Sequence, residues 1–154
     1  MAETARLTAM VDEWRAGLTP ACHDWPVTDE DRTAVAQLPA LPDDELAAAR
    51  HVHDLIYRWQ RGRCAVCGGG RSGELVLDHD HVTALVRGWL CRGCNVSEAH
   101  SDGGNFAKYR DRPPAVMLGV TARYVDPWYG LAEPRESHAQ WFARALENEP
   151  PPVT

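Results

Sequence analysis

Residues 64–98 read CAVCGGGRSGELVLDHDHVTALVRGWLCRGCNVSE and decide the fold of the chain. They contain two Cys-x-x-Cys pairs, Cys64/Cys67 and Cys91/Cys94, separated by 23 residues. Two residues between paired cysteines let both sulfur atoms reach one metal ion, and two such pairs favour a closed tetrahedral zinc site. Iron–sulfur ligation is the alternative, but the spacing is more typical of a zinc ribbon or treble-clef knuckle. We therefore predict that these cysteines hold a structural zinc ion.

The residues between and after the cysteine pairs predict a hairpin and a helix. Residues 75–77 and 85–90 are rich in β-forming side chains, which favours two strands joined by a short loop. A short helix is expected from Asn95 to about His100. Because so short a stretch cannot build a core of its own, the zinc ion would hold the hairpin and the helix in register.

A second group of polar residues lies inside the same stretch. Asp78-His79-Asp80-His81 follows the first predicted strand, and Asn95 comes directly after the last cysteine. One carboxylate and one amide oxygen suit a hard cation such as Mg²⁺ or Mn²⁺, with positions left for substrate and water. His79 is a usable base at neutral pH, since the pKa of an unperturbed imidazole is ~6.5. The alternatives are a polar turn or a second, purely structural metal site.

The run DHDHVTALVRGWLCRGCN, residues 78–95, resembles the signature of the HNH, or ββα-metal, nucleases. Within that group it is most similar to the phage recombination endonuclease VII family. Nearly every signature position is matched, and Ala84 stands where glycine is usual, which concerns only the turn after His81. The resemblance is confined to this central stretch and does not extend to the flanking helices.

This resemblance implies a metal-dependent DNA endonuclease that hydrolyses phosphodiester bonds, either by nicking or in a structure-selective way. It implies that Asp78 and Asn95 hold the catalytic divalent ion and that His79 is the general base. It also implies that His81 supports the scissile phosphate or the water, and that Glu98 lies near the metal. For Glu98, an acid on a helix surface is the simpler interpretation. Because junction-resolving relatives act as dimers, a homodimer is a further expectation.

A non-catalytic zinc module that binds DNA or protein is the competing hypothesis. Such a module has no need of Asp78, His79 and Asn95 together, so we favour the enzyme. Arg87, on the second predicted strand, is either a phosphate contact or an exposed charge at a sheet edge.

The distribution of charge agrees with a DNA partner, although the net charge of the chain is −6. Residues 58–124 carry ten Lys and Arg against six acids, whereas residues 1–57 carry four against eleven. The positive field therefore surrounds the motif, as expected of phosphate binding on one face. The acidic N-terminal third either limits non-specific DNA binding or contacts a protein partner. Arg58, Arg61 and Arg63 either meet phosphate or compensate a helix dipole.

Composition indicates an ordinary globular chain of 154 residues with 44% hydrophobic residues. No apolar run approaches the roughly 20 residues that a membrane span needs, and the N-terminus lacks the apolar region of a signal peptide. We expect a cytoplasmic protein with no membrane partner. In that compartment thiols stay reduced, so Cys22 is expected to be a free thiol. A role for Cys22-His23 as metal ligands lacks a second pair nearby.

The predicted fold class is α+β, with a zinc-bound nuclease core at 61–112 between helical extensions at 1–60 and 113–154. The apolar stripe of the first helix packs in the core or forms a dimer contact. A mobile proline-rich tail ends the chain. The stripe consists of Leu7, Met10, Val11, Trp14 and Leu18. The predicted flanking helices cover 3–17, 28–38, 43–60, 105–111, 114–122 and 137–147.

Overall fold

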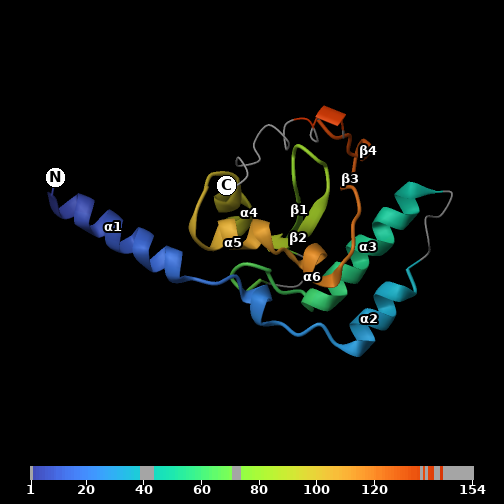
Figure 1. Ribbon diagram of the computed structural model, residues 1–154, viewed down its shortest axis with the longest axis horizontal. Coiled ribbons are helices and arrows are strands. Elements are labelled where there is room, and N and C mark those ends of the chain that lie inside the picture. The colour runs from blue at the N-terminus through green and yellow to red at the C-terminus, as the bar shows by residue number, and fades with distance from the viewer. Residues whose placement is uncertain are drawn as a thin grey trace, which may run out of the picture.

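The computed structural model describes residues 2–38, 44–70, 74–135, 137, 139–140 and 143. Helices surround two small antiparallel sheets (Figure 1), which confirms the predicted mixture of helices and strands. The last predicted helix and the proline-rich tail lie almost wholly outside the described residues. The elements are α1 Ala2–Gly17, η1 Ala21–Asp24, α2 Asp29–Ala36, α3 Glu45–Gln60, β1 Leu75–His79, β2 Val86–Cys91, α4 Arg92–Ala99, α5 Gly104–Asp111, α6 Pro114–Leu118, β3 Val125–Asp126 and β4 Gly130–Leu131.

Strands β1 and β2 form the antiparallel hairpin that the sequence predicts, with ends close to the predicted ones. Asp78 lies opposite Gly88, and the register then shifts so that His79 pairs with Val86. Such a bulge bends a strand and redirects the side chain at that point. Ala84, in the connecting turn, has φ 61°, a conformation that favours glycine. The turn therefore keeps a glycine-type backbone although alanine stands there.

Helix α3 packs against β2 and supplies much of the core. Its first turn is capped by Asp44, whose Oδ1 accepts hydrogen bonds from the backbone N–H of Leu46 and Ala47. The helix ends where the sequence predicts, since Arg61 and Gly62 both adopt left-handed φ angles of 53° and 68°. The buried face consists of Ala49, Val52, His53, Leu55, Ile56, Trp59 and Gln60.

Gln60 joins this helix to the hairpin and to the first cysteine knuckle, a role that the sequence does not reveal. Its side chain is fully buried. Its Nε2 donates to the carbonyls of Arg63 at 2.8 Å and Trp89 at 2.9 Å, and its Oε1 accepts from the Trp89 N–H at 2.8 Å. One amide thus satisfies three backbone groups where α3 meets β2.

Replacing Gln60 by leucine is expected to lower the free energy of unfolding by about 3 kcal/mol, because the Trp89 N–H and the Arg63 carbonyl lose their side-chain partner and the Trp89 carbonyl keeps only the Ala65 N–H. Urea denaturation of the zinc-loaded protein measures this change. The matched control is Gln37→Leu, since Gln37 is exposed at the end of α2. Equal stability of the two variants would contradict the role assigned to Gln60.

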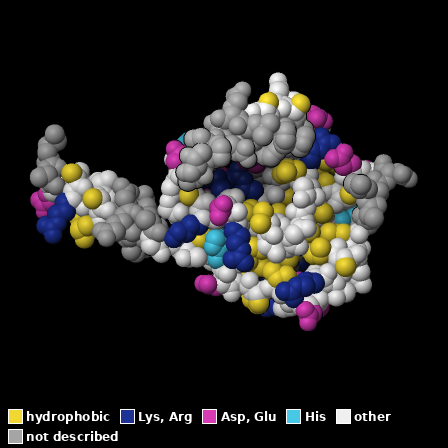
Figure 2. Space-filling model, in the orientation of Figure 1, with side chains coloured by type: hydrophobic (Ala, Val, Ile, Leu, Met, Phe, Trp, Pro, Cys, Tyr) yellow, Lys and Arg dark blue, Asp and Glu magenta, His cyan; other side chains and the backbone are white. Residues whose placement is uncertain are grey.

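The interpretation of the α1 stripe as part of the core is wrong for the side chains that the structure describes. Leu7, Met10 and Val11 are 58%, 55% and 42% exposed. The helix projects from the rest of the molecule and packs against α5 (Figure 1). Figure 2 shows hydrophobic side chains on the surface of this arm. Helical spacing of apolar residues identifies an amphipathic helix but not the surface that covers it; the dimer contact stays a prediction.

The chain after α5 returns to the hairpin and extends it. Helix α6 ends at Leu118, earlier than predicted, because Gly119 takes a left-handed φ of 69°. The following segment runs beside the start of β2, where Val86 N–H donates to the Ala122 carbonyl. Close packing here requires glycine in β2: a Cβ at Gly88 would lie 2.7 Å from the ring of Pro114. Helix α6 therefore lies directly against the hairpin.

Candidate active site and metal centre

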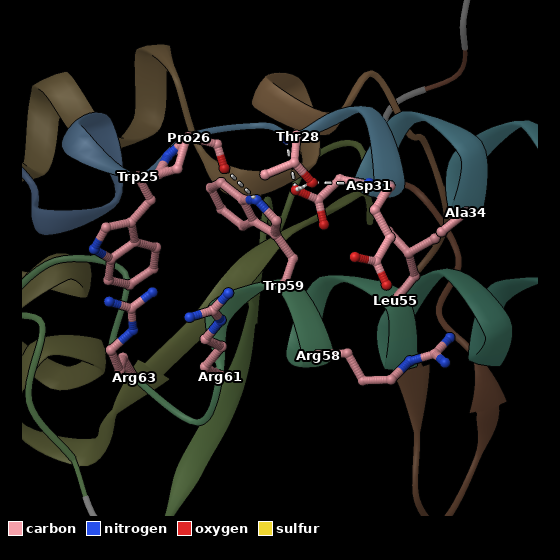
Figure 3. Close-up of a pocket in the computed structure, with 11 residues that line it drawn as sticks. Trp25, Pro26, Thr28, Asp31, Ala34, Leu55, Arg58, Trp59, Arg61 and Arg63 are labelled. Atoms are coloured by element: carbon pink, nitrogen blue, oxygen red, sulfur yellow. Dashed lines mark hydrogen bonds between the residues drawn. The ribbon is translucent and has the colours of Figure 1, made fainter.

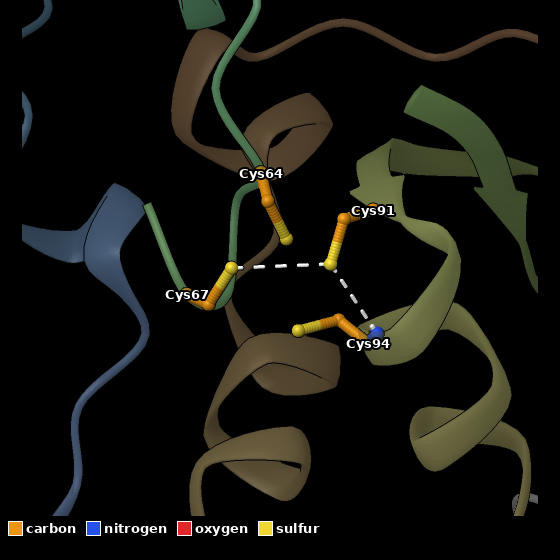
Figure 4. Close-up of side chains that lie close together, drawn as sticks. All are labelled: Cys64, Cys67, Cys91 and Cys94. Carbon is orange, nitrogen blue, oxygen red and sulfur yellow. Dashed lines mark hydrogen bonds between the residues drawn. The ribbon is translucent and has the colours of Figure 1, made fainter. Parts of the chain in front are cut away.

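The four cysteines predicted to bind zinc converge in space (Figure 4). Their sulfur atoms all lie within 4.8 Å of one another, and Sγ of Cys67 is 3.9 Å from Sγ of Cys91. A tetrahedral zinc ion with Zn–S bonds of about 2.3 Å would place sulfur atoms about 3.8 Å apart. The donor set and its spacing therefore fit one zinc ion. Cys91 also caps α4, since its Sγ accepts a hydrogen bond from the Cys94 N–H.

The electrostatics of the cluster lower the pKa of one thiol, that of Cys64, and raise the pKa of Cys67 and Cys94. A hydrogen bond from Cys94 lowers the pKa of Cys64, and backbone N–H groups add to this effect, although burial opposes it. The same hydrogen bond raises the pKa of Cys94. At least one sulfur is thus an anion before any metal binds, which is the form that coordinates zinc.

Cys22 and His23 take no part in this cluster. Cys22 is a buried free thiol whose pKa burial raises to about 12, and its N–H donates to the Ala65 carbonyl. His23 Nε2 lies 3.0 Å from the Arg112 carbonyl oxygen. The prediction that Cys22 is a free thiol agrees with this arrangement, and its contact with the knuckle is structural.

Asp78 lies at the end of β1 and is buried, with 3% of its surface exposed. Its Oδ2 accepts a hydrogen bond from the Tyr109 hydroxyl at 3.0 Å and lies 3.5 Å from Nη1 of Arg87. Burial raises the pKa of Asp78 to about 6, while the positive charge of Arg87 opposes the rise. Both contacts use the same oxygen, so the carboxylate can still offer Oδ1 to a cation.

Arg87 is the centre of a network of carboxylates and is not an exposed charge at a sheet edge. It contacts Glu98 Oε1 at 2.8 Å and Asp80 Oδ2 at 3.3 Å, in addition to Asp78. Arg110 pairs with the same oxygen of Glu98 at 2.7 Å. Glu98 is thus largely buried between two guanidinium groups instead of being a free acid on the helix surface.

His79 follows the bulge, and its ring is half-buried against two others. It stacks on Tyr124 with a centroid distance of 4.0 Å and on His81 at 4.8 Å. Burial lowers the pKa of His79 to about 4, and the charges of His81 and Arg87 act in the same direction. The imidazole is therefore neutral at pH 7 and able to accept a proton.

Asn95 occupies the first turn of α4, directly after Cys94, and is partly exposed. Helix α4 packs against both strands of the hairpin, so the cysteine cluster and the strands together fix its position. Among the described residues, the cysteines form the only group of three or more Cys, His, Asp or Glu side chains that is close enough to hold an ion. A second cation at Asp78 and Asn95 would thus rely on water and substrate for its other ligands.

The structure adds three residues that sequence reasoning missed. Tyr109 and Arg110, on α5, reach Asp78 and Glu98, and Tyr124 lies against His79. No motif marks them. In the sequence an aromatic residue on a helix looks like ordinary core, and only the contacts reveal its relation to the site.

Arg58, Arg61 and Arg63 lie apart from the candidate active site. They line a cavity of about 450 Å³ between α2 and α3 that none of the predicted site residues borders (Figure 3). The Arg63 guanidinium lies 4.0 Å above the ring of Trp25. The opposite wall carries Glu30 and Asp31. A phosphate contact by these arginines stays a prediction.

The family model for recombination endonuclease VII matches residues 43–124. The matched range contains all four clustered cysteines and every predicted site residue. The chain belongs to the recombination endonuclease VII family.

Two curated relatives are phage proteins that match the endonuclease VII-family chain in part. The Gene 59 protein of Mycobacterium phage D29 is 50% identical over 71 residues, 41% of this chain and 43% of the relative. The Gene 59 protein of Mycobacterium phage L5 is 50% identical over 42 residues, 26% of each protein. The matches thus span less than half of either relative. No solved structure matches the chain. No helix among the described residues is long and apolar enough to cross a membrane.

Proposed function

We propose that this endonuclease VII-family chain is a metal-dependent DNA endonuclease of the HNH, or ββα-metal, type. The observation that carries the proposal is the arrangement at the end of β1. Buried Asp78 and neutral His79 are adjacent there, and the hairpin leads into α4, which carries Asn95. The four cysteines anchor the same helix. A hairpin followed by a helix, with a carboxylate, an imidazole and an amide, supplies the groups that phosphodiester hydrolysis needs.

In this mechanism His79 accepts a proton from the attacking water. The ring is neutral at pH 7, so one of its nitrogen atoms can accept the proton. Stacking on Tyr124 fixes the orientation of the ring. Asp78 Oδ1 and the Asn95 amide oxygen would hold Mg²⁺ or Mn²⁺, which when bound stabilises negative charge on the phosphate and the leaving oxygen. Tyr109 and Arg87 fix the orientation of Asp78 through its Oδ2.

The remaining roles are also proposals. His81, stacked on His79 and exposed, supports the scissile phosphate or the water. Glu98 acts through its ion pair with Arg87, which touches Asp78, and not as a separate ligand. The division into 1–60, 61–112 and 113–154, the cytoplasmic location, the homodimer and a protein partner for the acidic N-terminal third stay predictions.

Plasmid nicking tests the proposed function. The zinc-loaded protein is expected to nick or linearise supercoiled DNA with Mg²⁺ or Mn²⁺ and to be inactive in EDTA. Asp78→Asn keeps an acceptor for Tyr109 but removes the charge, so the rate is expected to fall at least about 100-fold. Asp54→Asn, at an exposed position of α3, is the matched control. DNA binding without cleavage by the wild-type protein would favour the non-catalytic module instead.

The pH dependence of cleavage should report competition between protons and the divalent ion at Asp78. Below a pH of about 6 the metal-free Asp78 carboxyl is protonated, so cleavage is expected to decline there. Raising the Mg²⁺ concentration tenfold should move this decline toward lower pH, because the ion displaces the proton. Profiles of kcat/KM against pH at two Mg²⁺ concentrations measure the shift. A decline of kcat/KM that stays near pH 6.5 at both Mg²⁺ concentrations would indicate titration of an unperturbed histidine instead.

A further inference from the structure

The hairpin formed by β3 and β4 carries the two most exposed aromatic side chains among the described residues. Trp128 and Tyr129, in its turn, are 88% and 91% exposed. Neighbouring large aromatic side chains that stand free of the protein surface are typical of a contact with a partner molecule. The mechanism described above does not use them.

Hydrogen bonds to Asp126 fix the backbone of this turn. Asp126 Oδ1 accepts hydrogen bonds from the N–H groups of Trp128 at 2.8 Å and Tyr129 at 3.0 Å. The strands below pair in antiparallel register, with Asp126 opposite Gly130, whose φ of 80° completes the turn. The aromatic pair is thus displayed by an ordered hairpin.

This hairpin is hydrogen-bonded to the loop that carries the candidate active site. At its start, Tyr124 N–H donates to the Ala84 carbonyl at 2.7 Å, and the Tyr124 ring stacks on His79. After its end, Arg135 N–H donates to the Val82 carbonyl at 2.9 Å. Figure 1 shows β3 and β4 beside the turn of the β1–β2 hairpin. Two backbone hydrogen bonds and one ring contact therefore connect the segment that carries the aromatic turn to the loop that follows His79.

The charged side chains around the hairpin are of both signs, with Arg123 and Arg135 against three carboxylates, those of Glu45, Asp126 and Glu133. Arg123 is neutralised by Glu45 and Glu133, and the Asp126 carboxylate accepts the turn N–H groups. Arg135 is exposed, and its backbone N–H donates to the carbonyl of Val82, which lies in the loop directly after His81. Exposed aromatic side chains can bind bases by stacking, and an exposed arginine at the end of the same segment can bind the nucleic-acid backbone by charge.

We propose that Trp128 and Tyr129 stack on an unpaired nucleobase of the DNA substrate, beside the phosphate that His79 would act on. Paired bases within a duplex offer no free face to these rings, whereas a base at a bulge, flap or branch does. The hairpin would thereby direct cleavage to discontinuities in the duplex. This inference rests on the proposed DNA endonuclease function.

Fluorescence of 2-aminopurine placed at a single-base bulge tests the inference, with the same duplex fully paired as control. Binding is measured in the full-length Asp78→Asn variant, so that the DNA stays intact and the result does not depend on cleavage. Replacing both Trp128 and Tyr129 by alanine is expected to weaken binding of the bulged DNA about 10-fold to 100-fold and to abolish quenching. Affinity for the paired duplex should change less than about 2-fold. Phenylalanine at both positions should retain most of the preference.

Val116→Ala, at an exposed position of α6, is the matched control for loss of surface hydrophobicity. Equal affinity of the double alanine variant and its parent for bulged DNA would overturn the inference. A change of oligomeric state in the double variant, measured by sedimentation, would also overturn it by indicating a protein contact. If wild-type protein cleaves no DNA yet the hairpin-dependent quenching persists, the endonuclease proposal fails while the base-stacking site stands.

Discussion

Replacing His79 by alanine is expected to slow DNA cleavage by about 10²-fold to 10⁴-fold, the usual contribution of a general base. The physical reason is that burial lowers the pKa of His79, so its imidazole at the end of β1 is neutral at pH 7 and can accept a proton. His51→Ala, at an exposed position of α3, is the matched control and should cleave at the wild-type rate. Single-turnover cleavage of a short labelled DNA isolates the chemical step from product release.

Two measurements distinguish a role of His79 as the general base from a purely structural role. Zinc content and thermal stability of His79→Ala should stay close to wild type, apart from the loss of stacking on Tyr124. Added imidazole should restore part of the rate, since the substitution leaves space where the ring was. Cleavage by His79→Ala at the wild-type rate would remove His79 from the mechanism.

Removal of zinc is expected to unfold the region around 64–100. Structural zinc sites contribute about 10–16 kcal/mol of apparent binding free energy, more than the roughly 5–15 kcal/mol that stabilises a typical domain. Here the ion would link the knuckle before β1 to the start of α4, two segments joined by no disulfide. Chelation followed by circular dichroism and amide hydrogen exchange measures the loss of structure.

Cys91→Ser and Cys22→Ala form a matched pair for the zinc site. Cys91→Ser should lose both the zinc ion and the folded region, because Cys91 is a cluster member and caps α4. Cys22→Ala should retain one zinc per chain, since Cys22 lies outside the cluster. A chain that keeps its structure after chelation would show that the cysteines do not support the fold.

Local sequence signals were sufficient for the parts of the fold that depend on neighbouring residues. A capping box of Thr28 and Asp31 begins α2 at the start of the helix predicted for 28–38, and Asp44 caps α3 at the start of the helix predicted for 43–60. The alternation of β-forming residues gave the hairpin, and the cysteine spacing gave the cluster. The caps and strands are specified by residues within a few positions of them, and the two cysteine pairs share a motif that identifies them as partners although 23 residues separate them.

What the sequence could not provide is the meeting of distant segments. Nothing near Gln60 indicates that its amide pairs with Trp89, and nothing near Tyr109 indicates Asp78. The apolar stripe of α1 shows the opposite failure. Its spacing correctly predicts a helix with one apolar side, but among the described residues Leu7, Met10 and Val11 are exposed and do not pack in the core. Periodicity encodes which side of a helix is apolar but not which surface receives it.

The carboxylate network around Arg87 also implies an order of events during turnover. Three carboxylates, those of Asp78, Asp80 and Glu98, face two guanidinium groups, so the network has an excess of one negative charge when all are ionised. A phosphodiester is repelled by that excess. One divalent ion bound at Asp78, as proposed, would reverse the sign of the local field. The cation should therefore enter before the nucleic acid, and kinetics at limiting Mg²⁺ should show an ordered sequence with metal first.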